Sequence, residues 1–339
     1  MKYYPVVILY SDKFKLHKTE NHIERVERLD VIWDAIKKNV TNERYINSDV
    51  CIVKEDIPYL IHDSGYVDEI KNLCSRINRT IYLDADTQIS PKTYESALFA
   101  MNAVLQAVNT NKSLFCICLV RPPGHHVGRF GGAYGRTQGF CIFNNVVGGV
   151  IYARDKGQRP MIIDIDAHHG NGTQELLYEI DIPVIDIHQS PRTLYPGTGY
   201  IEEIGQGRGE GYQLNIPLEP LSGDDVFKVI CDEIVDPVLL EYKPNIVFVS
   251  LGFDSHELED ISSLKFTEFS YVYLFKLILK YRVKVIAVLE GGYSRGLRTI
   301  SDVINLPELS APKTKSDKKC FEPIHRCKKI FSEYFSYII

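Results

Sequence analysis

The stretch Pro160–Gly172, PMIIDIDAHHGNG, decides the fold of this chain. It opens with the apolar run MII, which is typical of a strand buried on both faces of a sheet. Asp164, Asp166 and His168 follow at alternate positions, and alternate residues of an extended chain point to the same side. A carboxylate oxygen and an imidazole nitrogen so spaced are able to bind one divalent metal. The stretch therefore predicts a buried strand that ends in a candidate metal site.

Two glycines after the histidine pair indicate a sharp turn into a helix. Gly170 and Gly172 let the backbone turn, and the pattern of Thr173–Tyr178 favours a helix. Taken alone, such a stretch is also compatible with a charged strand end in an ordinary α/β protein. The other motifs of the chain make that structural interpretation the weaker one.

The whole chain has the composition of a globular protein. It has 339 residues, 45% of them hydrophobic and 24% charged, which is enough for a large core. No repeat, low-complexity run or Ser/Gly/Pro-rich linker interrupts it, so we expect a single catalytic domain over residues 1–339. The formal net charge of -5 argues against direct binding to the nucleic-acid backbone. Oligomerisation stays open.

The cysteines and the N-terminus predict a cytoplasmic protein. The 8 cysteines lie scattered without the spacing of a zinc ribbon, and most of them have the surroundings of small buried hydrophobic residues. Such usage fits a reducing compartment. The N-terminal sequence MKYYPVVILYSDKF has too short an apolar run for a signal peptide, and no stretch approaches membrane-spanning length.

Apolar strands alternate with helical patterns, which predicts an α/β fold with a parallel sheet and helices on both faces. The predicted strands are Val6–Tyr10, Ser113–Val120, Met161–Ile163, Asp181–Ile187, Tyr212–Pro217, Asn245–Leu251 and Val283–Leu289. The predicted helices lie in 17–38, 62–70, 92–110, 146–154, 173–178, 223–242 and 266–281. The basic tail, 313–329, is expected to be a solvated surface.

The polar residues with chemical potential follow directly after apolar strands. They are His125 and His126, Asp166 and His168, Asp254, and Tyr293. In open α/β sheets the ligand crevice lies outside the carboxyl ends of the strands. We therefore expect four separate loops to converge on one site.

This constellation has the parts of a hydrolytic site. Asp166, His168 and Asp254 are a zinc-competent set with an open position, and water on such a metal attacks carbonyls at neutral pH. The pair His125 and His126 is placed to serve as base and acid. The phenol of residue 293 follows two glycines and is able to donate to a developing oxyanion, although a tyrosine packed at a strand end is the structural alternative.

Six motifs then carry a family resemblance over nearly the whole chain, from HIERVERL to about Tyr293. In order they are RPPGHH, GFCIFNN, DIDAHHGNGTQ, LYPGTG, LGFD and LEGGY, and together they resemble the zinc-dependent histone deacetylase family. Three of them, RPPGHH, HHGNGTQ and LEGGY, are similar to the class II branch and its bacterial and archaeal relatives, which include acetylpolyamine amidohydrolases and acetoin-utilisation proteins. The resemblance implies the arginase-like α/β fold, with a central parallel sheet of about eight strands flanked by helices.

The resemblance also implies residue roles. The zinc ligands would be Asp166, His168 and Asp254, and the catalytic residues would be His125, His126, Asp164, Asn171 and Tyr293. The substrate contacts would be Asp86 at the rim, Gly139 at the tunnel floor, and Phe140 and Tyr195 as tunnel walls, with Arg28 in an exit channel for acetate. A structural potassium ion would use Asp164, Asp166, His168 and Ile187, together with Asp186, which stands where the family has serine. The asparagine at 171 should leave His126 less basic than an aspartate would.

The chain also departs from the family pattern. The segment 127–139 is longer than in most relatives and should border the mouth of the site. Its two arginines, Arg129 and Arg136, would disfavour a cationic polyamine if they faced that mouth. The sequence SHELEDISS follows Asp254 without the usual Asp-Pro pair. The resemblance therefore does not predict the rim of the site near Ile261.

The implied activity is deacylation of acetyl-lysine or a related acylated amine by metal-activated water. Acetylated polyamines or other small amides are the alternative substrates. An arginase-type ureohydrolase would need a two-manganese cluster, and the loop AHHG lacks the additional bridging aspartate. A non-catalytic acyl-lysine binder would be marked by loss of a zinc ligand or of Tyr293, and none is lost. The physiological substrate and the preferred acyl length stay open.

Overall fold

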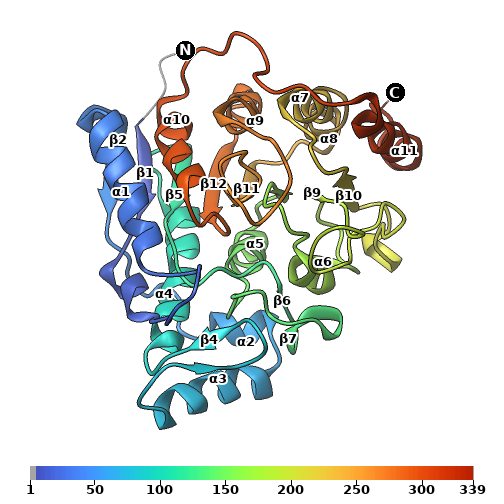
Figure 1. Ribbon diagram of the computed structural model, residues 1–339. Coiled ribbons are helices and arrows are strands. Elements are labelled where there is room, and N and C mark those ends of the chain that lie inside the picture. The colour runs from blue at the N-terminus through green and yellow to red at the C-terminus, as the bar shows by residue number, and fades with distance from the viewer. Residues whose placement is uncertain (1–4, 339) are drawn as a thin grey trace.

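The structure, a computed structural model, describes residues 5–338. At its centre lies an eight-stranded sheet in the order β10-β9-β8-β11-β12-β5-β1-β2, and every neighbouring pair is parallel (Figure 1). Its strands are β1 (Val6–Leu9), β2 (Tyr45–Ser48), β5 (Phe115–Cys118), β8 (Pro160–Asp164), β9 (Val184–Gln189), β10 (Gln213–Leu218), β11 (Ile246–Leu251) and β12 (Lys284–Leu289). The α/β class and the parallel sheet predicted from the sequence are confirmed.

Eleven α-helices accompany this sheet in the described part of the chain. They are α1 (Glu27–Asn39), α2 (Ile57–Ile61), α3 (Ser64–Arg76), α4 (Thr93–Asn109), α5 (Asn145–Asp155), α6 (Asn171–Leu177), α7 (Asp224–Ile230), α8 (Asp236–Tyr242), α9 (Glu268–Lys280), α10 (Ile300–Asn305) and α11 (Glu322–Phe331). Two short antiparallel pairs complete it, β3 (Ile81–Tyr82) with β4 (Gln88–Ile89), and β6 (Val127–Gly128) with β7 (Gly131–Gly132).

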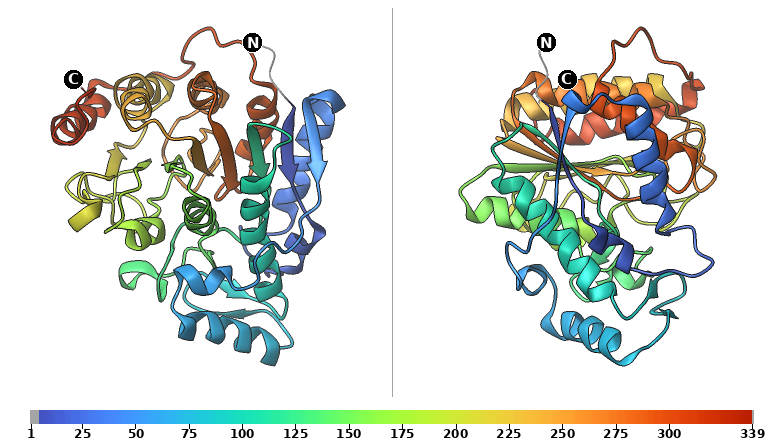
Figure 2. Two further views of the ribbon diagram at one scale, coloured as in Figure 1. Left: turned by 180° about the vertical axis from the view of Figure 1, so that it is seen from behind. Right: turned by 90° about the vertical axis from the view of Figure 1, so that its left-hand side faces the viewer.

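The helices form a layer on each face of the sheet. Helices α4 and α5 pack against one face, whereas α9 packs against the other with α7, α8 and α10 beside it (Figures 1 and 2). Because both faces are covered, the central strands β5, β8 and β11 are buried at every residue. This burial explains why they read as continuous apolar runs rather than alternating ones.

The predicted helix over 17–38 is correct only in its second half, because α1 begins at Glu27. The apolar face of α1, formed by Leu29, Ile32 and Ile36, is buried, as the spacing predicts. The preceding residues form a loop that carries Glu24 into the interior, where its carboxylate receives hydrogen bonds from Arg121. A buried ion pair therefore overrides the helical pattern there.

The predicted helix over 223–242 is divided in two. Helices α7 and α8 are joined by one wide turn, Cys231–Val235. Pro237 follows at the start of α8, where it has no N–H to donate and its ring excludes the regular bond to the preceding turn. The proline thus explains why the helix widens just before it.

The tail is not the simple solvated surface that its basic residues predicted. Helix α11 buries Ile324, Cys327 and Phe331 and packs against β10, the strand at one edge of the sheet (Figure 1). The Cys327 thiol lies 3.6 Å from the carbonyl oxygen of Asn215 in that strand. Arg326 and Lys329 of this helix are exposed, so charge dominates the sequence pattern although the helix covers a sheet edge.

All 8 cysteines are free thiols in the described residues, and only Cys51 among them is exposed. Burial raises the pKa of the Cys116 thiol to about 11, which fits an inert packing role. Across residues 5–338, no helix has the combination of length and apolarity that crossing a bilayer requires.

Candidate active site

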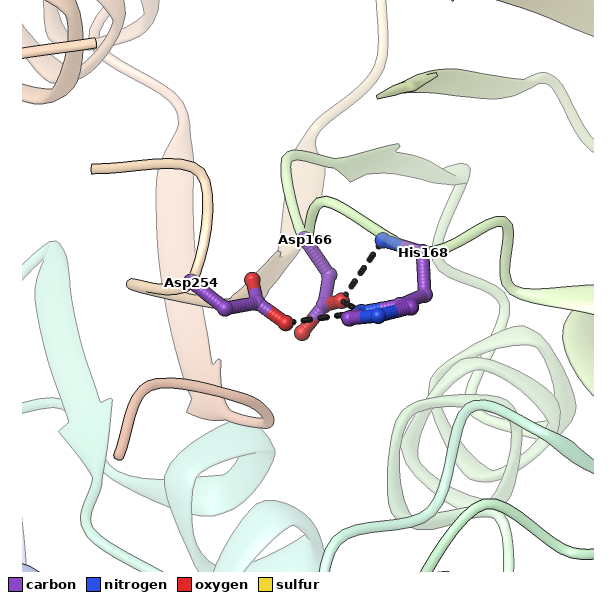
Figure 3. Close-up of side chains that lie close together, drawn as sticks. All are labelled: Asp166, His168 and Asp254. Carbon is purple, nitrogen blue, oxygen red and sulfur yellow. Dashed lines mark hydrogen bonds and ion pairs between the residues drawn. The ribbon is translucent and has the colours of Figure 1, made fainter. Parts of the chain in front are cut away.

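Loops from the carboxyl ends of four strands meet at one cavity of about 270 Å³. The loop after β5 brings His125 and His126, the loop after β8 brings Asp166 and His168, and the loop after β12 brings Tyr293. Asp254 follows β11 and lies beside the ligands of the β8 loop (Figure 3). The convergence expected from the sequence is therefore present.

Asp166, His168 and Asp254 form a compact cluster of candidate metal ligands. One ligand atom from each side chain lies within 4.8 Å of the others, and all three residues are buried. His168 Nδ1 lies 2.8 Å from Asp254 Oδ2 and 3.1 Å from Asp166 Oδ1. The dashed lines in Figure 3 mark these contacts. Two carboxylates and one imidazole are a donor set that zinc accepts. The residues present thus fit the metal that the family resemblance implies.

Backbone amides hold the outer oxygens of these carboxylates. Asp166 Oδ2 accepts a hydrogen bond from Gly291 N at 2.8 Å, and Asp254 Oδ1 accepts one from Ala167 N at 2.9 Å. The second oxygen of each carboxylate is left facing His168. Two carboxylates facing each other in the interior repel unless a cation lies between them, so this arrangement is suited to a divalent ion.

His126 is oriented by Asn171. Its Nδ1 lies 2.7 Å from Asn171 Oδ1, and Asn171 Nδ2 donates in turn to the carbonyl oxygen of Ala133 at 3.3 Å. Nδ1 therefore carries the proton, and Nε2 keeps a free electron pair. Burial, together with the charges of His125 and His168, lowers the pKa of His126. A neutral imidazole with a free nitrogen is the form that a general base requires.

His125 has the opposite electrostatics. Burial alone would lower its pKa, but the carboxylates of Asp166 and Asp164 outweigh burial and raise the pKa of His125. Its Nδ1 lies 3.1 Å from Asp164 Oδ2. The adjacent histidines are thus divided into a charged ring and a neutral one.

Glu290 also holds the loop that carries His125 and His126. One carboxylate oxygen of Glu290 accepts hydrogen bonds from the backbone of Gly124 at 2.7 Å and of His125 at 3.2 Å. The other oxygen has no hydrogen-bond partner among the described residues, and burial raises the pKa of Glu290 to about 7. This residue was not identified from the sequence, although it is the glutamate of the LEGGY motif.

Tyr293 lines the same cavity, and burial raises the pKa of its phenol, which keeps the phenol a donor. The guanidinium carbon of Arg28 lies 4.7 Å from the centre of its ring. Arg28 also donates from Nε to Gly292 O at 2.6 Å and from a terminal nitrogen to Glu24 Oε1 at 2.9 Å. The arginine that the resemblance assigns to an exit channel is therefore buried beneath the tyrosine loop.

The predicted substrate contacts enclose this cavity. Phe140, Tyr195 and Gly139 line it, and the Tyr195 ring lies 5.0 Å from that of His126. A Cβ atom on Gly139 would lie 2.4 Å from the His126 ring, so any side chain would push into the histidine. Gly139 also has a φ of +51°, which glycine adopts at little cost. Aromatic walls with no side chain at the floor favour a slender, apolar ligand.

Asp86 also lines the cavity, beside the segment 127–139. Its carboxylate accepts hydrogen bonds from the hydroxyl groups of Thr87 and Thr137, and burial raises its pKa. The sequence analysis did not name Cys141, Leu194 and Pro123 as lining residues, although each lies inside one of the six motifs. Ile261, at the rim that the sequence left open, does line the cavity.

Neither arginine of the segment 127–139 lines the cavity. Arg129 lies in a separate groove of about 500 Å³ together with Phe130 and Glu175. The Arg136 guanidinium lies near Gly197, and a Cβ atom there would be 3.7 Å from it. The segment contributes to the site through Thr137, whose carbonyl oxygen accepts from Tyr195 at 2.7 Å and whose hydroxyl group donates to Asp86.

The Asp186 carboxylate contacts a histidine. His188 Nδ1 lies 2.6 Å from Asp186 Oδ1, and His188 Nε2 lies 2.9 Å from Gly199 O. Both ring nitrogens of His188 thus face acceptor oxygens. The second oxygen of Asp186 accepts from Gly170 N at 2.9 Å. The carboxylate that replaces the family's serine is therefore engaged with a histidine.

Comparison with known proteins agrees with this geometry. Residues 22–304 match the histone deacetylase domain family. A protein of Methanothermobacter thermautotrophicus named probable deacetylase is 33% identical over 340 residues, which cover 98% of this chain and 100% of that protein. Another of that name, from Archaeoglobus fulgidus, is 35% identical over 300 residues, covering 85% and 81%. A chloroplastic histone deacetylase 10 of Oryza sativa subsp. japonica is 33% identical over 304 residues, covering 82% and 67%.

The fold agrees as well. A crystal structure described as that of the HDA15 HD domain superimposes with a TM-score of 0.88 and 25% sequence identity. The superposition covers 98% of each chain, so the eight-stranded sheet and its flanking helices are shared nearly in full.

Proposed function

The chain belongs to the histone deacetylase family, and from that premise we propose that it is a zinc-dependent deacetylase acting on acetyl-lysine or a related acylated amine. The observation that carries the proposal is the buried cluster Asp166, His168 and Asp254 at a cavity that His126 and Tyr293 also line. Zinc bound by these three side chains would supply Lewis-acid chemistry to the amide carbonyl and to the attacking water.

The side chains of the cavity would carry the protons. His126 accepts a proton from the attacking water at Nε2, because Nδ1 is committed to Asn171. The phenol of Tyr293 donates a hydrogen bond to the carbonyl oxygen as charge develops on it. The acyl carbon gains the hydroxyl group, its bond to nitrogen breaks, and the amine leaves with the proton held by His126. The products are a carboxylate and a free amine.

A long side chain is the substrate form that suits the cavity. Phe140 and Tyr195 would flank its methylene groups, and Asp86 would bind polar groups at the rim. We propose an acyl-lysine in a peptide as the first substrate class and an acylated polyamine as the second. A structural potassium ion would depend mainly on Asp164 and on the backbone oxygens of Asp166, His168 and Ile187, since Asp186 contacts His188.

A substrate panel tests this proposal. Zinc-loaded protein should hydrolyse an acetyl-lysine peptide, with acetylspermidine, acetylputrescine and longer acyl-lysine peptides for comparison. Tyr293→Phe should lower kcat by about 10²–10³, the loss typical of one oxyanion donor, while zinc stays bound. Hydrolysis of arginine with two equivalents of manganese would instead favour a ureohydrolase. A tenfold or greater preference for acetylspermidine would overturn the peptide assignment.

A further inference from the structure

The loop that follows the ligand Asp254 turns back toward the loop of Tyr293. Within it, Glu259 is 4% exposed, although it is a charged residue in a connecting segment. Among the described residues no cation contacts the Glu259 carboxylate, and all of its hydrogen-bond partners are backbone amides. A buried carboxylate without a cation is stable only if such donors satisfy both oxygens.

Four hydrogen bonds join the Glu259 carboxylate to the segment 293–296. Oε2 accepts from Tyr293 N at 2.8 Å and from Ser294 N at 3.0 Å. Oε1 accepts from Ser294 N at 2.9 Å and from Gly296 N at 2.8 Å. Hydrogen bonds to a charged acceptor are about twice as strong as neutral ones, so this carboxylate is a strong anchor for the loop.

The loop of Tyr293 needs such an anchor because two glycines in it allow the backbone many conformations. Gly291 and Gly292 precede Tyr293, and Gly292 has a φ of +105°, a conformation open mainly to glycine. On the carbonyl side, Arg28 binds Gly292 O. On the amide side, Glu259 binds Tyr293 and its neighbours, and Ser294 Oγ donates back to Leu258 O at 2.9 Å. The backbone at Tyr293 is thus held from both sides.

We propose that Glu259 is a positioning residue that acts through Tyr293 and couples the tyrosine loop to the loop of the ligand Asp254. The inference rests on the proposed function, in which the phenol stabilises the oxyanion. Glu259 does not line the cavity, so it has no contact with substrate. Its effect is to keep the phenol oriented toward the carbonyl oxygen, where an error of a fraction of an ångström weakens transition-state stabilisation.

The test is Glu259→Gln, which keeps the shape of the side chain. The amide replaces one acceptor oxygen by an NH₂ group that faces backbone N–H donors, so about half of the anchor is lost. We expect kcat to fall at least about tenfold, with KM and zinc content within about twofold of wild type. Hydrogen exchange of a peptide spanning 291–297 should accelerate. Glu259→Asp keeps the charge on a shorter side chain, so its kcat should lie between those of wild type and Glu259→Gln. This variant replaces Glu259→Gln in the test if the glutamine variant does not fold.

A double-mutant cycle with Tyr293→Phe distinguishes an effect of Glu259 on the Tyr293 phenol from a general destabilisation of the active site. If Glu259 acts through the phenol, Glu259→Gln should change kcat by less than about twofold in the phenylalanine background. Equal losses in both backgrounds would overturn the inference. So would a Glu259→Gln enzyme with wild-type kcat and unchanged exchange at 293–296.

The matched control is Asp224→Asn. Asp224 is also a fully buried carboxylate that accepts backbone amides, from Thr267 at 2.9 Å and Lys313 at 3.0 Å, but none of its hydrogen-bond partners lies in the loop of Tyr293. The Asp224→Asn variant should be less stable than wild type but should have the same kcat. If wild-type enzyme hydrolysed no acyl amide, the proposed function would fail, and hydrogen exchange would then decide alone whether Glu259 holds the tyrosine loop.

Discussion

At the scale of the residue, the site is built from pairs in which one member sets the state of the other. Asn171 leaves His126 with a proton on Nδ1, whereas Asp164 faces the same atom of His125. The outcome is one neutral and one charged imidazole in adjacent positions. Side-chain identity alone does not produce this difference, because both rings are histidine and both are buried.

The ligand cluster gives a prediction about metal content. Asp254→Ala removes one of three ligands and leaves the other carboxylate facing His168, so bound zinc should fall well below the roughly one equivalent expected for wild type. Elemental analysis after purification with zinc measures this. Asp260→Ala, which removes an exposed acid of the same loop, should keep full zinc. Equal zinc in the two variants would contradict the assignment.

At the scale of the element, short loops carry the chemistry and buried polar side chains hold the loops. His62, at the end of α2, accepts from Asn144 N at 3.0 Å and lies 2.7 Å from Gly128 O, so it joins the segment 127–139 to the start of α5. Asn144 caps α5 by accepting from Val147 N at 3.0 Å. One neutral histidine thus connects two elements that border the site.

His62 predicts a specific pH dependence of stability. Burial lowers its pKa from 6.5 to about 4 in the folded protein, so the unfolded chain binds its proton first as the pH falls. The stabilisation is present above about pH 6.5 and is lost as the pH falls toward 4. Between pH 7 and pH 5 the wild type should lose about 2 kcal/mol more unfolding free energy than His62→Gln.

Urea unfolding at the two pH values measures this difference. His325→Gln, at an exposed position of α11, is the control and should follow the wild type. Parallel losses in wild type and His62→Gln would show that His62 does not carry the effect.

At the scale of the whole molecule, residues that lie far apart in the chain meet at the carboxyl ends of the parallel strands. Arg28 reaches Gly292, and His126 meets Asn171, because the strand order places β12, β5 and β8 close together. The segment 127–139 borders the site at these strand ends. Glu175 holds it in place by accepting hydrogen bonds from Arg129 N at 2.8 Å and Tyr134 N at 3.2 Å. Its arginine side chains are left outside the cavity.

This placement predicts that the arginines do not select the substrate. In Arg129→Ala/Arg136→Ala, the ratio of kcat/KM for an acetyl-lysine peptide to that for acetylspermidine should stay within about twofold of wild type, because exposed charges outside the cavity are screened. Asp86→Asn, which neutralises the acid that does line the cavity, should change the ratio and is the comparison variant. A shift of about tenfold in the arginine variant would show that these side chains reach the mouth in solution.

The sequence by itself determined the parallel α/β architecture and the cluster of three candidate ligands. Continuous apolar runs require burial on both faces, and parallel strands present the residues that follow them at one edge. We therefore expected Asp166, His168 and Asp254 to converge, and the structure brings one ligand atom of each within 4.8 Å of the others.

Only the tertiary structure decided the supporting contacts. Glu24 breaks a helical pattern because a distant arginine pairs with it, and α11 is recognised as an edge cover only when β10 is beside it. The sequence assigns no role to Glu259 or Glu290, yet both are buried against backbone amides. Periodicity reports which face of an element is apolar, whereas the partner of a buried charge depends on three-dimensional distances that no local pattern contains.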